Sequence, residues 1–164
     1  MIFEFPKKLI NLGADYTIFD KNNDFLCSVD FVKGGLIINN STSKLIAQVI
    51  KDKKGVLINI ADSPSIYIDE DINIKEYLVA DKNMDKDVDT AKRRIPKFDY
   101  FTFGDLYTYS YDLFQKSKDE TKPIVIANII NNPLNDDIFK VRIDDDCNIL
   151  KTLCIIFAIS MLIY

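Results

Sequence analysis

Short stretches in which apolar and polar residues alternate fill most of the chain between Tyr16 and Ile143. Three of these stretches place the following residues on one face each: Phe25, Cys27, Val29 and Phe31; Tyr107, Tyr109, Tyr111 and Leu113; and Phe139, Val141 and Ile143. Successive side chains of a β-strand point to opposite faces of the sheet. A period of two therefore predicts strands that each have one apolar face.

Clusters of turn-forming residues separate these stretches about every 8 to 12 residues. They are Lys21–Asp24, Lys33–Gly35, Asn39–Ser43, Asp52–Gly55, Asp62–Pro64 and Asn131–Pro133. Gly34 and Gly35 are expected to form a hairpin turn, because the further glycines and the following helix of a phosphate-binding loop are missing. Lysines 51, 53 and 54 fall in one such turn, where they favour solubility and protect a sheet edge. Short strands at this spacing are typical of an antiparallel sandwich or barrel.

The C-terminal segment Leu153–Tyr164 is apolar except for Ser160. Asn148 and the acidic residues before it offer a helix N-cap and negative charge at the helix start, which predicts a helix over 148–163. A helix that is apolar on all sides must be enclosed by protein or by lipid. At about 1.5 Å per residue, the 149–164 stretch falls short of the about 30 Å hydrocarbon core of a bilayer. We expect a helix buried within the protein, with a membrane tail anchor as the alternative.

An apolar helix that follows many one-sided strands indicates a sheet wrapped around that helix. We expect a mainly β fold, a closed antiparallel β-barrel of about twelve strands with the C-terminal helix through its centre. The whole chain, 1–164, is expected to be one domain, with strands over about 1–143 and the helix over about 148–163. The core positions expected on the helix are Leu153, Ile156, Phe157, Ser160 and Met161.

The composition excludes several classes of function. The chain has 164 residues, 21 Lys plus Arg against 25 Asp plus Glu, and a net charge of −4. This acidic balance argues against a nucleic-acid binder, which needs a basic face. No His is present, so catalytic mechanisms and metal sites that use imidazole are excluded. The three cysteines, Cys27, Cys147 and Cys154, are odd in number and widely spaced, and we expect them to be free thiols in a reducing compartment.

The strongest basic feature of the chain is the cluster of Lys92, Arg93, Arg94 and Lys97. Arginine binds phosphate oxygens in a bidentate manner, so these four cations predict a site for anions or lipid headgroups. The alternative is a solvated surface segment, because several aspartates directly precede the cluster. The charge-dense region 84–94, with Asp89 and Arg93 at i,i+4 spacing, is expected to form a short exposed helix or an excursion between strands.

A second cluster, Asp144, Asp145 and Asp146, lies just before the predicted helix. Three carboxylates could contribute to a calcium site, although the glycine and the final glutamate of an EF-hand loop are missing. Helix capping is the alternative role of the same residues. No activated nucleophile or defined carboxylate pair is found, so we expect a protein that is not an enzyme and has no cofactor.

The closing segment of the chain carries a family resemblance. Phe139–Asp146, Cys147–Leu150 and the apolar run to Tyr164 resemble the end of the Tubby C-terminal-like superfamily, which includes phospholipid scramblases and the LURP-one/YxjI-like proteins. The segments Tyr16–Asp20, Asp24–Cys27 and Ile46–Asp52 resemble the rhythm of the LURP-one strands. The resemblance implies an antiparallel barrel of about twelve strands around a C-terminal helix. It also implies phosphoinositide binding, as in Tubby proteins, or roles in calcium binding and lipid movement, as in scramblases.

Two functions follow as expectations. The first is a binding module for anionic lipid headgroups at the cytoplasmic face of a membrane, which requires an exposed basic cluster around Arg93. The second is a small acidic protein that binds another protein, which requires an exposed apolar or aromatic patch, for example with Tyr107, Tyr109 or Tyr111 if they do not face the core. The N-terminal segment has no signal-peptide pattern, which favours a cytoplasmic location. The ligand and the oligomeric state stay open.

Overall fold

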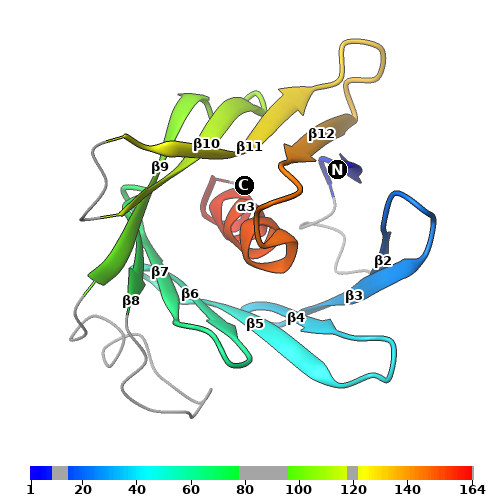
Figure 1. Cartoon of the computed structure of the whole chain (residues 1–164), viewed down its shortest axis with the longest axis horizontal. Helices are drawn as coiled ribbons and strands as arrows, with labels where there is room; N and C mark the ends of the chain where they lie inside the picture. The colour runs from blue at the N-terminus through cyan, green and yellow to red at the C-terminus, as the bar shows by residue number, and fades with distance from the viewer. Residues whose placement is uncertain (9–14, 78–95, 118–121, 164) are drawn as a thin grey trace.

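The computed structural model describes residues 1–8, 15–77, 96–117 and 122–163, with the side chains of 96–98 and 117 outside the description. These residues form a sheet of 12 strands and the helix α3 (Figure 1). The strands are β1 (Ile2–Pro6), β2 (Tyr16–Phe19), β3 (Phe25–Val32), β4 (Gly35–Asn39), β5 (Leu45–Lys51), β6 (Gly55–Ile60), β7 (Ile66–Asp69), β8 (Ile74–Tyr77), β9 (Pro96–Asp105), β10 (Ser110–Ser117), β11 (Ile124–Asn131) and β12 (Ile138–Ile143), and α3 covers Ile149–Ile163. The predicted mainly β class is confirmed.

The sheet is a meander with one long-range pairing. Its order is β1-β12-β11-β10-β9-β8-β7-β6-β5-β4-β3-β2, so consecutive strands are neighbours except where β1 pairs with β12. All the pairings are antiparallel. Antiparallel strands can be joined by tight turns, which agrees with the regular turn clusters of the sequence.

The predicted closure of the barrel is not confirmed, because β1 and β2 are the two ends of the sheet and no ladder joins them within the described residues. A side chain bridges the two edges instead: the Tyr16 hydroxyl on β2 donates a hydrogen bond to the Glu4 carbonyl on β1 at 3.2 Å. Pro6 is the last residue of β1, and it has no backbone N–H that could donate to a strand on the open edge. The sheet therefore curls around the helix without a continuous ring of backbone hydrogen bonds.

Helix α3 lies inside the curled sheet (Figure 1), as predicted. Leu153, Ile156, Phe157, Ser160 and Met161 are all buried. The predicted N-cap is also confirmed, because the Lys151 backbone N–H donates to the Asn148 side-chain oxygen at 3.0 Å. The Phe157 ring packs edge-on against Phe5 of β1, with centroids 5.3 Å apart. Among the described residues, no helix is both long and apolar enough to cross a membrane.

Polar contacts hold both ends of α3 against the sheet. Near its start, the Lys151 ammonium lies 3.1 Å from the Glu76 carboxylate, and Glu76 also accepts a hydrogen bond from the Tyr100 hydroxyl at 2.5 Å. Near its end, the Lys51 ammonium on β5 donates to the Met161 carbonyl at 2.8 Å. A cation at this position also interacts favourably with the negative end of the helix dipole. These contacts hold the helix at one position along its axis. Apolar packing alone does this poorly, because it is not directional.

The predicted one-sided strands are mostly confirmed. Phe139, Val141 and Ile143 are buried, as are Cys27, Val29, Tyr109, Tyr111 and Leu113. Tyr107 is the main correction: its side chain is 73% exposed, because β9 ends at Asp105 and the chain turns before β10 begins at Ser110. Phe25 at the start of β3 is also exposed, beside a β-bulge in the β2–β3 pairing. The helix predicted over 84–94 lies outside the described residues.

The three cysteines are free thiols, as predicted. Cys27 and Cys154 are buried in the main core. Burial raises the pKa of the Cys27 thiol to about 11, and burial followed by the proximity of Cys27 raises the pKa of Cys154 further. A thiol that stays protonated behaves as a small apolar side chain and is a poor nucleophile.

Candidate functional site

The predicted basic cluster falls largely outside the described part of the chain. Lys92, Arg93 and Arg94 are not described, and Lys97 belongs to β9 but its side chain is not described. The anion site predicted from these four residues therefore stays a prediction. What the structure adds is the position of Pro96, two residues after Arg94, at the start of β9.

The acidic cluster forms an exposed turn before α3. Asp144, Asp145 and Asp146 are all exposed, and a carboxylate oxygen of Asp145 lies 3.3 Å from the amino group of Met1. Within residues 1–8, 15–77, 96–117 and 122–163, no group of three His, Cys, Asp or Glu side chains is arranged to hold a metal ion. The helix cap is Asn148 itself rather than one of the aspartates. The calcium site predicted from these three aspartates therefore stays a prediction.

An aromatic strip crosses the outer face of β9, β10 and β11. It consists of Phe101, Phe103, Phe114 and Val125, and cross-strand pairing places Phe101 beside Phe114 and Phe114 beside Val125. The Phe101 and Phe114 rings are stacked, with centroids 4.8 Å apart and an interplanar angle of 5°. Phe103 is 75% exposed and Phe101 38% exposed. Contiguous apolar side chains on a protein surface mark an interaction site more often than isolated ones do.

Cations lie at one end of this strip. Antiparallel pairing brings the start of β9, the end of β10 and the start of β11 to the same end of the sheet. Lys75, Asp99 and Lys116 are cross-strand neighbours there, and Lys122 is exposed just before β11. At the other end, the Asp112 carboxylate accepts a hydrogen bond from the Asn128 amide at 2.7 Å. The strip thus has a basic end and a polar end.

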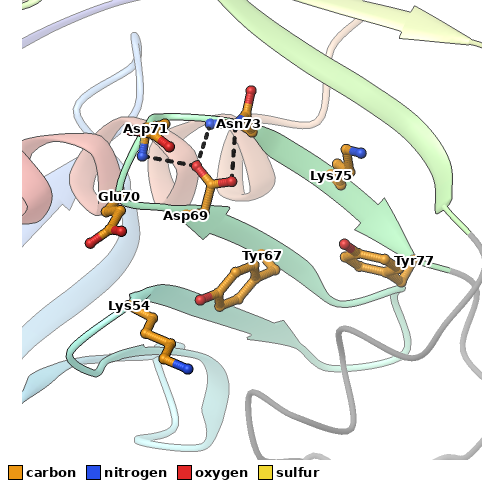
Figure 2. Close-up of a pocket in the computed structure, with 8 residues that line it drawn as sticks. All are labelled: Lys54, Tyr67, Asp69, Glu70, Asp71, Asn73, Lys75 and Tyr77. Atoms are coloured by element: carbon orange, nitrogen blue, oxygen red, sulfur yellow. Dashed lines mark hydrogen bonds between the residues drawn. The ribbon is translucent and has the colours of Figure 1, made fainter.

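A pocket lies on the outer face of β6, β7 and β8 (Figure 2). Its volume is about 570 Å³, and it is lined by Lys54, Tyr67, Asp69, Glu70, Asp71, Asn73, Lys75 and Tyr77. Ile66 and Ile68 belong to the main core, so Tyr67 and Asp69 must point to the opposite face of β7. A volume of this size is in the usual range for small-molecule sites.

The floor of the pocket is aromatic. Tyr67 and Tyr77 are buried and form a small apolar cluster with Leu57, separate from the main core. Tyr67 extends over Gly55, where a Cβ atom would lie only 2.7 Å from the Tyr67 hydroxyl and 2.2 Å from the Ile68 carbonyl oxygen. Any larger residue at position 55 would displace Tyr67, so the glycine permits this ring position.

Asp69 is a fixed negative charge beside these rings. Its carboxylate accepts hydrogen bonds from the backbone N–H groups of Asp71 at 2.9 Å and Asn73 at 3.0 Å, and from the Asn73 amide at 3.0 Å. Partial burial works to raise the pKa of Asp69, but the hydrogen bonds from Asn73 and Asp71 and the charge of Lys75 outweigh it and lower the pKa. The carboxylate is therefore ionised and held in one orientation.

Negatively charged carboxylates near Tyr77 affect the pKa of its hydroxyl. Burial, followed by the charges of Asp99 and Asp69 and the presence of Tyr67, raises the pKa of the Tyr77 hydroxyl. One carboxylate oxygen of Asp99 is itself buried with no hydrogen-bond partner among the described residues. The pocket thus combines two phenol rings with the carboxylate of Asp69, and the charge of Asp99, which does not line the pocket, acts on Tyr77.

Sequence reasoning missed this pocket. It assigned Lys54 to turn solubility, and it did not single out the strands β7 and β8. The signal was present, because a period of two places Tyr67 with Asp69 and Lys75 with Tyr77 on matching faces. What the sequence could not show is that these strands are neighbours with Tyr67 paired opposite Lys75.

No family model, curated protein or solved structure matches this chain. The function must therefore be inferred from the residues themselves.

Proposed function

We propose that this protein is a non-enzymatic binding module that attaches to anionic lipid surfaces through the aromatic strip of Phe101, Phe103, Phe114 and Val125. The observation that carries the proposal is the exposure of Phe101 and Phe103 on one face of the sheet, with the Phe101 ring stacked on the half-buried Phe114. Transfer of a fully exposed Phe side chain out of water is worth about 1.5–3 kcal/mol. Shallow insertion of this strip into a bilayer interface would gain part of that energy for each ring.

The charges around the strip favour an anionic surface. Lys75, Lys116 and Lys122 lie at its basic end, and each cation near an anionic membrane contributes about 1 kcal/mol. In the sequence, Ile95 alone separates the cluster Lys92–Arg94 from β9, the strand that carries Phe101 and Phe103. A local group of cations can bind an anionic surface even though the chain has a net charge of −4.

The family resemblance supports the same proposal. Membership in the Tubby C-terminal-like superfamily would imply lipid-headgroup binding by basic residues, and twelve antiparallel strands curled around a C-terminal helix are compatible with it. We propose this kinship together with the function. A location at the cytoplasmic face of the membrane is part of the same proposal.

Vesicle co-sedimentation tests the proposal. The purified full chain is mixed with phosphatidylcholine vesicles, with or without phosphatidylglycerol or a phosphoinositide, and the bound fraction is measured in low and high salt. We expect binding only to the anionic vesicles and weaker binding in high salt, because salt screens exposed charges. Phe103→Ser should greatly reduce binding, and the double variant Arg93→Ala/Arg94→Ala should reduce it as well.

Leu134→Ser is the matched control for Phe103→Ser. Leu134 is an apolar side chain that is 96% exposed in the turn between β11 and β12, away from the strip, so its removal should leave vesicle binding unchanged. An equal loss of vesicle binding in both variants would mean that any exposed apolar side chain contributes to binding and that the strip is not a defined site. A protein that ignores every vesicle would refute lipid binding and leave the strip to a protein partner, the second function expected from the sequence.

A further inference from the structure

The pocket on β6, β7 and β8 adjoins the basic end of the aromatic strip and shares Lys75 with it, but its tyrosines, Tyr67 and Tyr77, are not part of the strip. The charged residues that line the pocket differ in how deeply they are buried. The Asp69 carboxylate is partly buried, whereas the cations Lys54 and Lys75 are exposed at the rim together with Glu70 and Asp71. Figure 2 shows Asp69 above the Tyr67 ring and held by Asn73 and Asp71, so its charge cannot swing away.

Two features of this interior attract a cation. The Tyr67 and Tyr77 rings line the pocket, and the faces of aromatic rings attract ammonium groups, most strongly where water is excluded. The fixed carboxylate of Asp69 adds a full negative charge beside them. An anion would be repelled by the Asp69 carboxylate, while the rim lysines have long flexible stems and can turn outward to solvent.

We propose that this pocket binds a small organic ammonium group between Tyr67, Tyr77 and Asp69. Lys75 then acts as a competing cation: it lines the pocket and its charge acts on Asp69. A ligand ammonium takes over the interaction with Asp69 while the Lys75 side chain moves outward. The proposal does not depend on lipid binding by the aromatic strip, so either can fail alone.

NMR titration of the ¹⁵N-labelled full chain tests the proposal directly. Tetramethylammonium chloride is the probe, and sodium phosphate, glucose and sodium chloride are the comparison solutes at equal ionic strength. The backbone amides of Asp71 and Asn73 report on the site, because both donate to Asp69. We expect saturable shifts of these amides with tetramethylammonium only. Saturation with phosphate or glucose, or a tetramethylammonium response no different from that of sodium, would overturn the proposal.

Two charge variants with matched controls make the test sharper. Asp69→Asn removes the negative charge but keeps an acceptor oxygen for the turn, and it should weaken tetramethylammonium binding about ten-fold. Asp62→Asn is the control: Asp62 is an exposed residue before β7 with a positive φ of 58°, which Asn tolerates, and the affinity should not change.

Lys75→Met distinguishes a site for cations from a site for anions. Removing the competing cation should strengthen tetramethylammonium binding about five-fold, whereas the same change would weaken a site for anions. Lys44→Met, at an exposed position in the turn before β5, is the control and should have no effect. Weaker tetramethylammonium binding in Lys75→Met would overturn the proposal, even if Asp69→Asn failed to fold. Phe103→Ser should leave the titration unchanged.

Discussion

We expect the ion pair between Lys151 and Glu76 to be one of the contacts whose mutation lowers the stability of the protein most. Glu76 is almost fully buried, with 1% of its side chain exposed, and Lys151 retains 20%. Their charged atoms are 3.1 Å apart, which at an effective dielectric constant of about 20 corresponds to a Coulomb energy of about 5 kcal/mol. Desolvation of both groups offsets much of this energy. Removing only one partner leaves the other as a buried, uncompensated charge.

The test is a double-mutant cycle followed by urea unfolding. We expect Lys151→Met to lower the free energy of unfolding by about 3–5 kcal/mol, because among the described residues Glu76 would keep only the Tyr100 hydroxyl as a side-chain partner. The double variant Lys151→Met/Glu76→Leu should lose less than Lys151→Met, since an apolar pair can replace a buried ion pair at little cost. The loss that remains comes from the Tyr100 hydroxyl, which no longer has Glu76 as its acceptor. Circular dichroism gives the urea midpoint, and an unchanged m-value shows that the change is one of stability.

A small effect would refute this reasoning. If Lys151→Met lost less than about 1 kcal/mol, the pair would behave like an exposed ion pair. Additive losses in the double variant would show that the two side chains do not interact. Lys140→Met is a suitable control, because its ion pair with Glu4 at 3.3 Å joins two exposed or half-exposed side chains. We expect that variant to change stability by no more than about 1 kcal/mol.

Four further predictions concern the core and the helix. Phe157→Asp should prevent stable folding, because it places an unpaired charge beside Phe5 in the core, and a soluble, folded monomer would contradict this. Asn148→Ala should lower the free energy of unfolding by about 1 kcal/mol through loss of the cap, measured in urea. The Cys27 thiol, with its pKa raised by burial to about 11, should react with a thiol reagent at pH 8 only after denaturant is added. Burial, followed by the charge of Glu76, raises the pKa of the Tyr100 hydroxyl above its usual value. The free energy of unfolding should therefore be unaffected below about pH 10 and fall as the pH rises further, because the unfolded tyrosine loses its proton first. Unchanged stability at high pH would contradict this.

The helix and most of the strands could be predicted because their signals are local. The segment that begins at Asn148 contains both the cap and the apolar core face of α3, and both are confirmed. The alternation Phe139, Val141 and Ile143 gives the apolar face of β12 in the same way. Tyr107 shows where this reasoning fails: it continues the period of β10, but the chain is still in the turn. Periodicity cannot detect where a strand begins.

The candidate sites depend on long-range pairing and were harder to predict. The aromatic strip exists because β9, β10 and β11 align Phe101, Phe114 and Val125 in one row. The pocket exists because β7 and β8 set Tyr67 beside Lys75. Register is decided by the packing of whole strands against the core, and no local pattern in this sequence specifies it.

By itself, the sequence determined the elements of this protein: strands with one apolar face, a capped apolar helix, and a chain without imidazole chemistry. Only the tertiary structure decided that the sheet stays open between β1 and β2, and that Glu76 faces the core. Glu76 is acceptable there because Lys151, 75 positions away along the chain, supplies the opposite charge. Periodic burial is a local property of a strand or helix, whereas edge pairing and charge compensation arise only when distant segments meet.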